Sequence, residues 1–236
     1  MEKASIHAGG EAEIQQVIRH YDGIAEHYEA DRFDNSYGRY VDAQEQRVLR
    51  RWLAPVRNGL ILDLACGTGR LLHLATHGLD ASQEMVRLAR QKHSAKDIRC
   101  GRATNLEELK IRFDAIFCMH LFMHLPPEEI QMVLDACFDR LRTDGLLIFD
   151  VPSPSRRKLT GFRPVGWHAG TAMALSSLVA MIGTNWRLAS QRGILFFPIH
   201  QVSGKLRPLL RPMDDFLGAT PLKRLSSYLL FCLERK

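Results

Sequence analysis

No stretch of the 236-residue sequence contains the roughly eighteen consecutive uncharged apolar residues that a membrane-spanning helix needs. The longest candidate, residues 169–183, has fifteen residues and is typical of a buried helix. The first residues, Met-Glu-Lys-Ala-Ser, form no apolar segment of the kind found in secretory signals. We therefore expect a cytoplasmic protein without a membrane span. Its 46% of hydrophobic residues are enough for one substantial core.

Cysteines are few and show no paired spacing. The five cysteines stand at positions 66, 100, 118, 137 and 232, and no Cys-x-x-Cys pair occurs among them. An odd number, mostly in apolar segments typical of strands, predicts reduced thiols rather than disulfides. Cys66 is a candidate nucleophile by its place beside a glycine-rich turn, but a small residue that fills space is the favoured interpretation.

Negative charge is scarce in one part of the chain. The formal net charge is +6, and residues 1–120 carry 17 basic and 17 acidic side chains, whereas residues 151–224 carry 11 basic and two acidic ones. This excess can steer an anionic molecule or attract a membrane surface, although a solvated basic face explains it equally well. Basic residues are not interleaved with aromatic ones, so a nucleic-acid partner has little support.

The most informative stretch that is present is ILDLACGTGR, residues 61–70. An apolar run, an acidic residue and two glycines predict a buried strand, a tight turn and a helix start, a common site for a nucleotide-like ligand. No lysine follows the glycines, which excludes a phosphate-binding P-loop. Leu72 stands where a dinucleotide-binding turn has its third glycine, and Asp63 would repel a diphosphate. Asp63 suits a cationic amino group instead.

Five stretches in this order resemble the motifs of class I S-adenosylmethionine-dependent methyltransferases. The turn at 63–70 resembles the first motif, and GLDASQEM at 78–85 resembles the end of the second strand. GRATNL at 101–106 resembles the loop beside the adenine, FDAIFC at 113–118 the fourth strand, and LRTDGLLI at 141–148 the turn into the fifth. The resemblance covers about residues 15–236 and implies S-adenosylmethionine as cofactor and S-adenosylhomocysteine as product.

The resemblance implies which residues bind this cofactor. Asp63 would meet the amino acid end and Asp80 the ribose hydroxyls, although Asp80 also fits an acid at a helix start beside a Ser82 cap. Two features depart from the family. Only eleven positions separate Gly69 from Asp80, which predicts a short helix at 70–75, and Arg102 stands where the adenine loop is usually acidic. The adenine amino group would then need a backbone carbonyl or Asn105. The implied set is Asp63, Ala65, Gly67, Gly69, Asp80, Ala81, Met85, Ala103, Thr104, Asn105, Cys118 and Tyr28.

Alternating strand and helix patterns predict a Rossmann-like α/β fold. Residues 1–58 form a helical cap or lid of the same domain, with helices at 11–29 and up to 53 joined by a loop at 31–40. The methyltransferase domain, 59–236, contains strands at 60–65, 77–80, 97–101, 112–119, 145–151, 186–196 and 226–233, and helices at 70–75, 82–93, 127–142 and 171–182. Residues 152–170 and 198–224 are basic, irregular inserts. The resemblance implies a mostly parallel seven-stranded sheet with an antiparallel last strand and helices on both faces.

Catalytic candidates are few, because methyl transfer depends mainly on placing the acceptor atom against the methyl group. His120 and His124 follow the fourth strand, at the sheet edge where ligands bind, and are candidate general bases. Packing within a turn is the alternative for both. Their spacing of four also fits a metal site, but no His-Glu-x-x-His motif or third ligand is present, so no metal is expected. Candidate substrate-pocket residues are Tyr21, Tyr37, Arg39, Tyr40, Trp167 and His168.

The predicted function is methyl transfer to an oxygen or nitrogen of a small metabolite. The Asn/Asp-Pro-Pro-Tyr motif of DNA and protein amino-group methyltransferases is absent after the fourth strand, which favours a small-molecule acceptor. The basic region and the apolar segment 169–183 support a second hypothesis, a lipid-linked or glycan acceptor. A third is a non-catalytic scaffold with this fold, or an enzyme that uses the cofactor without methylating. The sequence leaves the acceptor, the methylated atom and the oligomeric state open.

Overall fold

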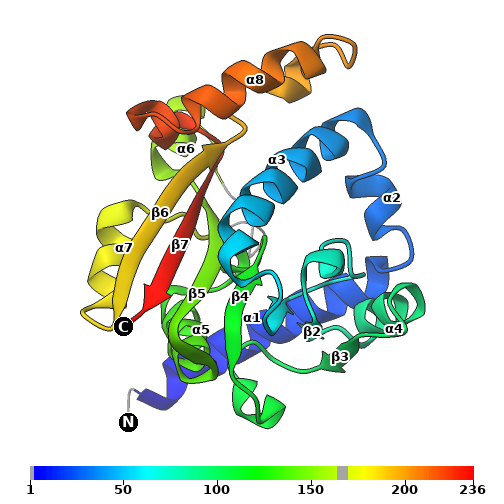
Figure 1. The fold of residues 1–236 in the computed structure, drawn as a ribbon, viewed down its shortest axis with the longest axis vertical. Helices are drawn as coiled ribbons and strands as arrows, with labels where there is room; N and C mark the ends of the chain where they lie inside the picture. Colours follow the sequence, from blue (N-terminus) through cyan, green and yellow to red (C-terminus); the bar gives the residue numbers. More distant parts are fainter. Residues whose placement is uncertain (1–2, 164–169) are drawn as a thin grey trace.

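One seven-stranded sheet forms the centre of the protein. The computed structural model describes residues 3–163 and 170–236, with side chains from residue 12 onward in these ranges. The strand order is β3-β2-β1-β4-β5-β7-β6 (Figure 1). The strands are β1 (Ile61–Leu64), β2 (His77–Asp80), β3 (Asp97–Cys100), β4 (Phe113–Cys118), β5 (Leu141–Pro152), β6 (Trp186–Ile194) and β7 (Tyr228–Arg235).

The strand directions confirm the expected sheet. Neighbours among β1 to β5 are parallel, whereas β7 is antiparallel to both β5 and β6. β6 therefore points the same way as the first five strands, and only the last strand in the sequence is reversed. β1 and β4 lie side by side where the strand order switches direction, and ligands of open α/β sheets bind beyond such a switch point.

Helices cover both faces of this sheet, because its central strands are apolar on both sides. On one face, α3 (Ser36–Leu53) and α4 (Gln83–Lys92) contribute Leu49 and Ala89 to a core cluster that includes Phe117 of β4. On the other face, α5 (Pro127–Arg140) and α7 (Leu175–Ile182) contribute Leu134 and Leu178 to a second cluster. The sheet is thus the middle of three layers, as predicted.

The N-terminal part is helical, as predicted, with α1 (Lys3–Ile24), α2 (Tyr28–Arg32), α3 and a 3-10 turn η1 (Ala54–Val56). The loop expected at 31–40 is wrong in its second half, since α3 already begins at Ser36. The cause is a cap that the sequence reading passed over. Asn35 Oδ1 accepts a hydrogen bond from the backbone N–H of Gly38 at 2.8 Å, which satisfies one of the free donors at the helix start.

The helix expected at 70–75 is wrong as well. The segment forms a single 3-10 turn, η2 (Leu72–Leu74), because β2 starts at His77 and leaves no room for two α-helical turns. The N–H groups around this turn are used within the protein: Gly67 N donates to Asp80, and Gly69 N donates to the carbonyl of Cys66. The turn therefore presents no helix N-terminus to a ligand.

Both inserts predicted as irregular contain helices. Residues 152–170 include α6 (Pro154–Thr160), and residues 198–224 include α8 (Arg207–Leu217) and a 3-10 turn η6 (Pro221–Leu225). Pro154 and Pro208 lie in the first turn of their helices, where a proline is tolerated because its missing N–H would have no helical partner. Proline is a helix breaker only further in. The helix expected at 171–182 begins later, at Leu175.

α6 and α8 lie at the edge where the parallel strands end. α6 directly follows β5, and α8 follows β6 after a short 3-10 turn, η5 (Ile199–Gln201). Figure 1 shows α8 across the top of the molecule with α6 beside it, and both termini at the opposite end. In residues 3–163 and 170–236 we find no helix that is both long and apolar enough to cross a membrane.

Candidate cofactor and active site

The glycine-rich turn after β1 passes through the left-handed region three times. Ala65, Gly67 and Gly69 have φ angles of +60°, +54° and +88°. Gly69 is also required for space, because a Cβ there would lie 2.9 Å from the ring of His93. At Gly67 the nearest atom to an added Cβ is Met85 Sδ, 4.0 Å away. Gly67 therefore leaves the backbone open towards a cavity.

This cavity lies beyond the carboxyl ends of β1, β2 and β4. Its empty volume, the open mouth included, is about 950 Å³. The wall consists of the glycine-rich turn, the end of β2, the loop 101–104, residues 119–125 and one side of α1. Of the residues predicted from the sequence, the cavity brings together Tyr21, Tyr28, Ala65, Gly67, Asp80, Ala81, Met85, Ala103, Thr104, His120 and His124.

Asp63, at the end of β1, is a buried carboxylate that lacks a partner. It is 3% exposed, and its Oδ2 has no hydrogen-bond partner among the described residues. It lines a second, smaller hollow that shares Tyr28, Gly67 and His120 with the main cavity. Burial raises the pKa of Asp63 well above its usual range, and the attraction of Arg70 only partly opposes this. A cationic group placed in the hollow would compensate the buried charge.

Asp80, at the end of β2, is held rigidly at the cavity wall. Its Oδ2 accepts a hydrogen bond from Gly67 N at 2.7 Å, and its Oδ1 accepts one from Ser82 N at 2.9 Å. The cap of α4 belongs to Ser82, whose Oγ accepts from Met85 N at 3.2 Å. The two N–H bonds orient the Asp80 carboxylate, so it stands ready to accept hydroxyl donors from a ligand.

An acidic residue that the sequence reading missed lies beside Arg102. Glu129, in the first turn of α5, lines the cavity, and its Oε2 is 3.6 Å from Arg102 Nη2. The motif pattern pointed to the loop at 101–106, where the family's acid is replaced by arginine. The fold brings an acid to the same place from α5, twenty-seven positions later in the chain.

His120 lies between two carboxylates. Its Nε2 is 2.6 Å from Glu45 Oε1, and its Nδ1 is 3.3 Å from Asp150 Oδ2. Asp150 Oδ1 also accepts a hydrogen bond from His120 N at 2.5 Å, which holds the residue at a φ of +61°. Burial lowers the pKa of His120, but Glu45 and Asp150 outweigh it and raise the pKa to about 9. At neutral pH His120 is therefore an imidazolium.

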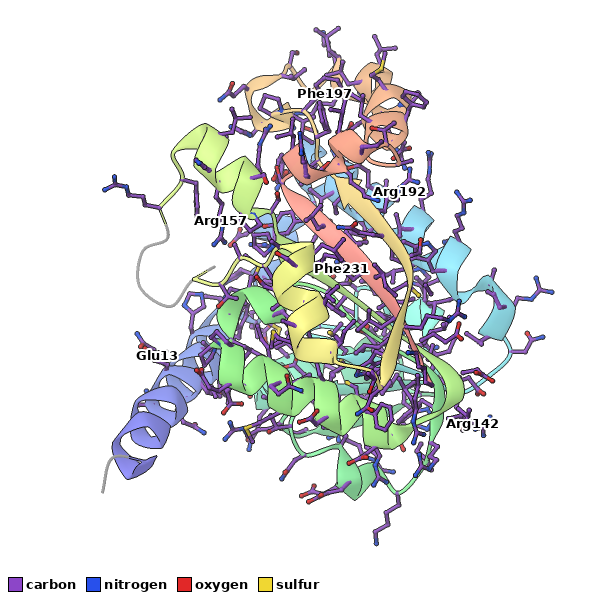
Figure 2. The ribbon with its side chains drawn as sticks, turned by 90° about the vertical axis from the view of Figure 1, so that its left-hand side faces the viewer. Glu13, Arg142, Arg157, Arg192, Phe197 and Phe231 are labelled. Atoms are coloured by element: carbon purple, nitrogen blue, oxygen red, sulfur yellow. The ribbon has the colours of Figure 1, made fainter. Side chains whose placement is uncertain are left out.

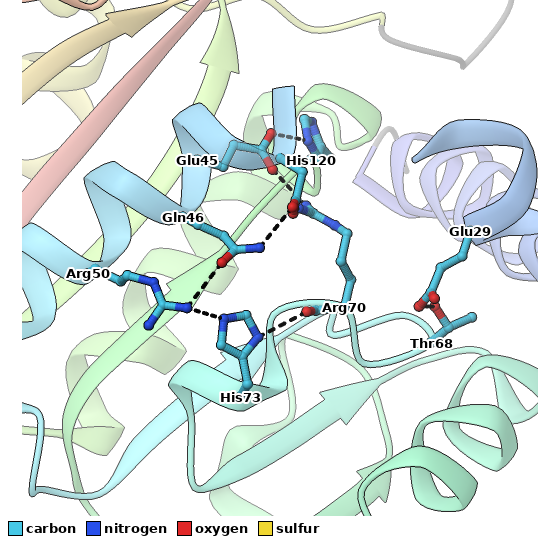
Figure 3. Close-up of polar contacts among 9 residues, drawn as sticks. Glu29, Glu45, Gln46, Arg50, Thr68, Arg70, His73 and His120 are labelled. Atoms are coloured by element: carbon cyan, nitrogen blue, oxygen red, sulfur yellow. Dashed lines mark hydrogen bonds and ion pairs between the residues drawn. The ribbon is translucent and has the colours of Figure 1, made fainter. Parts of the chain in front are cut away.

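Glu45 extends this group to the glycine-rich turn. Its second oxygen binds Arg70 Nη2 at 2.7 Å (Figure 3). Arg70 also pairs with Asp42 on α3. Burial raises the pKa of Glu45, but His120 and Arg70 outweigh it and lower the pKa to about 2. The network clamps α3 to the turn and to the loop after β4. No local pattern in the sequence indicated it, because its members lie far apart in the chain.

His124 forms a polar pair with Tyr21 in the cavity wall. Tyr21 Oη lies 3.1 Å from His124 Nε2, and the two rings meet edge to face with centroids 5.9 Å apart. Burial raises the pKa of Tyr21, and the neighbouring Tyr28 raises it further. Tyr21 therefore keeps its proton at neutral pH and can donate it in a hydrogen bond. This pair joins α1 to the segment after β4.

Helix α1 and the start of α2 are fastened to the cofactor loops. Asp22 Oδ1 accepts hydrogen bonds from Ser82 Oγ at 2.6 Å and from Glu84 N at 3.3 Å. Glu29 accepts a hydrogen bond from the hydroxyl of Thr68 in the glycine-rich turn (Figure 3). The N-terminal helices thus close one side of the cavity.

The remaining predicted residues lie elsewhere. Gly69 shapes the turn, Asn105 precedes a 3-10 turn η3 (Leu106–Leu109), and Cys118 is buried within β4; none of them lines either cavity. Cys66 is buried beside the turn, and burial raises the pKa of its thiol well above the usual range, as expected for a residue that fills space.

The predicted substrate residues on α3 also face away from the cavity. Tyr40 donates a hydrogen bond to Asp214 at 3.0 Å, Tyr37 packs in the same small cluster as Tyr40, and Arg39 is exposed. Core packing on α8 and β6 therefore accounts for Tyr40. Trp167 and His168 lie outside the described residues.

Known proteins resemble the part of the chain that builds this cavity. Residues 61–145 match the family model of a methyltransferase domain. A relative from Geobacillus sp. (strain WCH70) that is named a methyltransferase is 36% identical over 104 residues, which are 39% of this chain and 42% of the relative. The demethylmenaquinone methyltransferase of Bacteroides fragilis is 28% identical over 170 residues, 66% of this chain and 68% of the relative. The first of these matches spans less than half of the relative's length.

A similar fold occurs in a SAM-dependent methyltransferase from Thermotoga maritima. That structure superposes with a TM-score of 0.67 and covers 93% of this chain and 99% of its own, at 14% identity. At such an identity the likeness concerns the fold alone. The match to the family model concerns the sequence itself. It covers the strands and turns from β1 to the start of β5, which carry Asp63, Gly67 and Asp80. Residues 61–145 thus resemble a methyltransferase domain, within a fold that the chain shares with S-adenosylmethionine-dependent methyltransferases.

Proposed function

We propose that this protein transfers the methyl group of S-adenosylmethionine to an oxygen or nitrogen of a small molecule bound in the main cavity. The observation that carries the proposal is the unpartnered Oδ2 of Asp63, buried beside the glycine-rich turn. An unpaired buried carboxylate costs free energy unless a partner compensates it. The ammonium group of the cofactor's methionine end has the charge, and the hollow has the position, for that role.

Residues suited to the ribose and the adenine of the cofactor also line the main cavity. The oriented carboxylate of Asp80 would accept hydrogen bonds from the two ribose hydroxyls. Glu129 would accept one from the adenine amino group, a role for which the sequence offered only a backbone carbonyl or Asn105. Ala103 and Thr104 line the cavity between these two acids, and Met85 lies against the glycine-rich turn. When bound, the cofactor supplies an electrophilic methyl group on a positively charged sulfur.

The Tyr21–His124 pair is the proposed proton acceptor. An acceptor hydroxyl or amine must lose a proton when it is methylated, and His124 can take it, with Tyr21 positioning the ring. His120 does not suit this role, because it already carries a proton between Glu45 and Asp150. We assign His120 a structural role, in which it holds the loop after β4 against α3 and the glycine-rich turn.

Calorimetry with S-adenosylhomocysteine tests the cofactor site. We expect Asp63→Asn to weaken binding at least tenfold, because it removes the negative charge that faces the ammonium group, and to leave the fold intact. Asp97→Asn is the control, since Asp97 is exposed and pairs with Arg99 on the surface. Equal affinity of Asp63→Asn and the unmodified protein would refute the assignment. No binding by the unmodified protein would favour the scaffold hypothesis.

A methyl-transfer assay tests the acceptor site. The protein is incubated with methyl-labelled cofactor and a panel of phenols, amines and quinols, and products are identified by the mass of one added methyl group. For the acceptor that reacts, His124→Asn should lower kcat about 10²- to 10⁴-fold while the affinity for S-adenosylhomocysteine stays within twofold. Retained kcat in His124→Asn would exclude His124 as the base.

A second candidate acceptor is an apolar, lipid-linked molecule. The cavity wall is rich in aliphatic side chains, including Ile14, Val17, Leu121 and Leu125. One relative is named a demethylmenaquinone methyltransferase, and menaquinone carries a long apolar chain. In the same assay, this candidate predicts that a quinol with an isoprenoid tail reacts faster than the tail-less quinol. Equal rates for the two quinols would count against it.

A further inference from the structure

Helix α8 presents its apolar face to solvent. Leu206, which precedes the helix, and Leu209, Met213 and Phe216 within it follow each other at steps of three and four positions, so they form one stripe. Their exposed fractions are 53%, 74%, 54% and 65%. We call these four residues the apolar stripe. In a globular protein such a stripe normally faces the core, so its exposure indicates that another molecule binds to it.

The buried side of α8 is acidic, which fixes the helix in this orientation. Asp214 accepts hydrogen bonds from Tyr40 Oη at 3.0 Å and from Phe196 N at 2.8 Å. Asp215 accepts one from Gln44 at 3.2 Å and pairs with Arg47. Both aspartates are less than a tenth exposed. Rotating α8 so that the stripe faced inward would bury four apolar side chains but expose these hydrogen bonds to solvent. The hydrogen bonds therefore hold the helix with its apolar side towards solvent.

Further exposed apolar residues lie at the same end of the molecule. Leu159 and Phe162, in and just after α6, are 65% and 50% exposed, and Leu222 of η6 is 44% exposed. α6 is tied to η6, since Ser153 Oγ donates to the carbonyl of Arg224, and η6 packs against α8. Both views place α6 and α8 at one end (Figures 1 and 2). Among the residues whose side chains the structure describes, seven of the ten large hydrophobic ones that are exposed lie on these three elements or directly beside them.

The chain segment that carries the stripe has few acidic residues. The only acids between residues 151 and 224 are Asp214 and Asp215, which point inward, whereas eleven lysines and arginines lie in the same range. Lys158, Arg163, Lys205 and Arg224 among them are exposed. A second copy of the chain docked on this face would bring two such basic surfaces together, which costs free energy. A surface with apolar depth and negative charge complements both features.

We propose that the end of the molecule formed by α8, α6 and η6 docks on an anionic lipid bilayer, with the apolar stripe inserted among the headgroups and the surrounding lysines and arginines against the lipid phosphates. This end is also the edge of the sheet at which the strands that build the main cavity terminate. The docking goes beyond the methyl-transfer function proposed above and stands without it. The apolar segment 169–183, which the sequence singled out, contributes less, because Leu178 and Ile182 of α7 are buried in the core.

Vesicle flotation tests the proposal. The 236-residue protein is mixed with vesicles of phosphatidylglycerol and phosphatidylcholine, or of phosphatidylcholine alone, at low and at high salt. We expect at least tenfold more protein on the anionic vesicles at low salt, and a decrease at high salt because salt screens the lipid charge. Absence of binding to anionic vesicles at low salt would overturn the proposal.

A pair of double variants separates the stripe from general charge effects. Leu209→Glu with Phe216→Glu should lower binding to anionic vesicles at least tenfold. The control, Met132→Glu with Val179→Glu, makes the same change at two exposed apolar positions, 49% and 52% exposed, on α5 and α7. It should change binding less than twofold. Equal losses in both variants, or a loss in the control alone, would show that the stripe is not the docking site.

Two further measurements distinguish docking on a bilayer from dimerisation and from damage to the cofactor site. Sedimentation without vesicles reports the oligomeric state, and a dimer that Leu209→Glu with Phe216→Glu dissociates would assign the stripe to a second copy and overturn the proposal. Calorimetry with S-adenosylhomocysteine on the same variant should give unchanged affinity, since the stripe lies outside the cofactor site. Unchanged affinity together with lost flotation supports docking, whatever the methyl-transfer assay shows.

Discussion

At the scale of single residues, the two histidines after β4 have opposite surroundings. His120 has a carboxylate at each ring nitrogen, whereas His124 faces the hydroxyl of Tyr21. A buried histidine between Glu45 and Asp150 is stabilised as a cation, and the trio is stable only while that proton is present. The protonation of His120 should therefore appear in the stability of the whole protein.

Stability should fall as pH rises through the pKa of His120. The folded pKa, about 9, lies above the ordinary value of 6.5, so the folded state holds the proton more tightly than the unfolded state. The resulting stabilisation is fully present below pH 6.5 and is lost as pH rises through 9; a shift of this size corresponds to about 3 kcal/mol. Urea unfolding from pH 6 to 10 measures it. The difference in unfolding free energy between the unmodified protein and His120→Asn should shrink across that window, and a constant difference would disprove the protonated trio.

Glu129 should contribute to cofactor affinity even though it lies outside the family motifs. It is the acidic side chain that the fold brings to Arg102 at the cavity wall. We expect Glu129→Gln to weaken S-adenosylhomocysteine binding about fivefold to tenfold, because glutamine keeps an acceptor oxygen but a hydrogen bond to a charged acceptor is worth roughly 1–1.5 kcal/mol more than one to a neutral acceptor. Calorimetry checks this, with Glu128→Gln, one position earlier and exposed, as the control. Equal affinity of both variants would remove Glu129 from the site.

The sequence could predict the residues that share a motif and could not predict those that meet only in space. Asp63, Gly67 and Asp80 lie at or just after strand ends within twenty positions of each other. Gly67 and Asp80 line the main cavity, and Asp63 lines the smaller hollow beside it. Glu129 and the trio of Glu45, His120 and Asp150 come from separate elements. Their partnership depends on how α3 and α5 pack on the sheet, which no local periodicity encodes.

At the scale of elements, the central strands β1 and β4 are the easiest to predict, because buried parallel strands are near-continuous apolar runs bounded by turn residues. Two helices of the C-terminal third, α6 and α8, could not be predicted, for two physical reasons. Prolines in the first turn of α6 and α8 resemble helix breakers although that position tolerates them. Pro212 lies inside α8, where it removes one hydrogen bond, and the apolar side of this helix faces outward. The sequence pattern of such a helix does not show whether its apolar side packs on the core or faces solvent.

Alanine substitutions at two glycines should separate the cost of backbone strain from the loss of space for a ligand at the glycine-rich turn. Gly67 and Gly161 have φ of +54° and +64°, and an added Cβ would have no atom closer than 4.0 Å at either position. Gly67→Ala and Gly161→Ala should each cost about 1 kcal/mol in unfolding free energy, the price of a left-handed alanine. Only Gly67→Ala should weaken S-adenosylhomocysteine binding, by tenfold or more, because only Gly67 lines the cavity. Equal affinities in calorimetry would mean that no ligand approaches this turn.

At the scale of the whole molecule, the N-terminal helices and the sheet enclose the cavity between them. α1 supplies one wall. Its Asp22 bonds to the start of α4, and its Tyr21 contacts His124 after β4. Glu29 of the neighbouring α2 bonds to the glycine-rich turn. A cofactor or acceptor deep in the cavity can enter or leave only when some of these contacts open. Release should therefore depend on the strength of the contacts between α1 and α4.

Asp22→Ala should loosen α1 and speed up release of the cofactor product. The carboxylate of Asp22 accepts two hydrogen bonds from the start of α4, and losing them should cost about 1 kcal/mol of closure, or about fivefold in the off-rate of S-adenosylhomocysteine. Stopped-flow displacement measures the off-rate, and hydrogen exchange measures the protection of the α1 amides, which should fall in parallel. Glu26→Ala is the matched control, because Glu26 pairs with Arg87 on the exposed surface, where ion pairs contribute little. If the two variants release the product at the same rate, α1 is a fixed wall of the cavity rather than a lid.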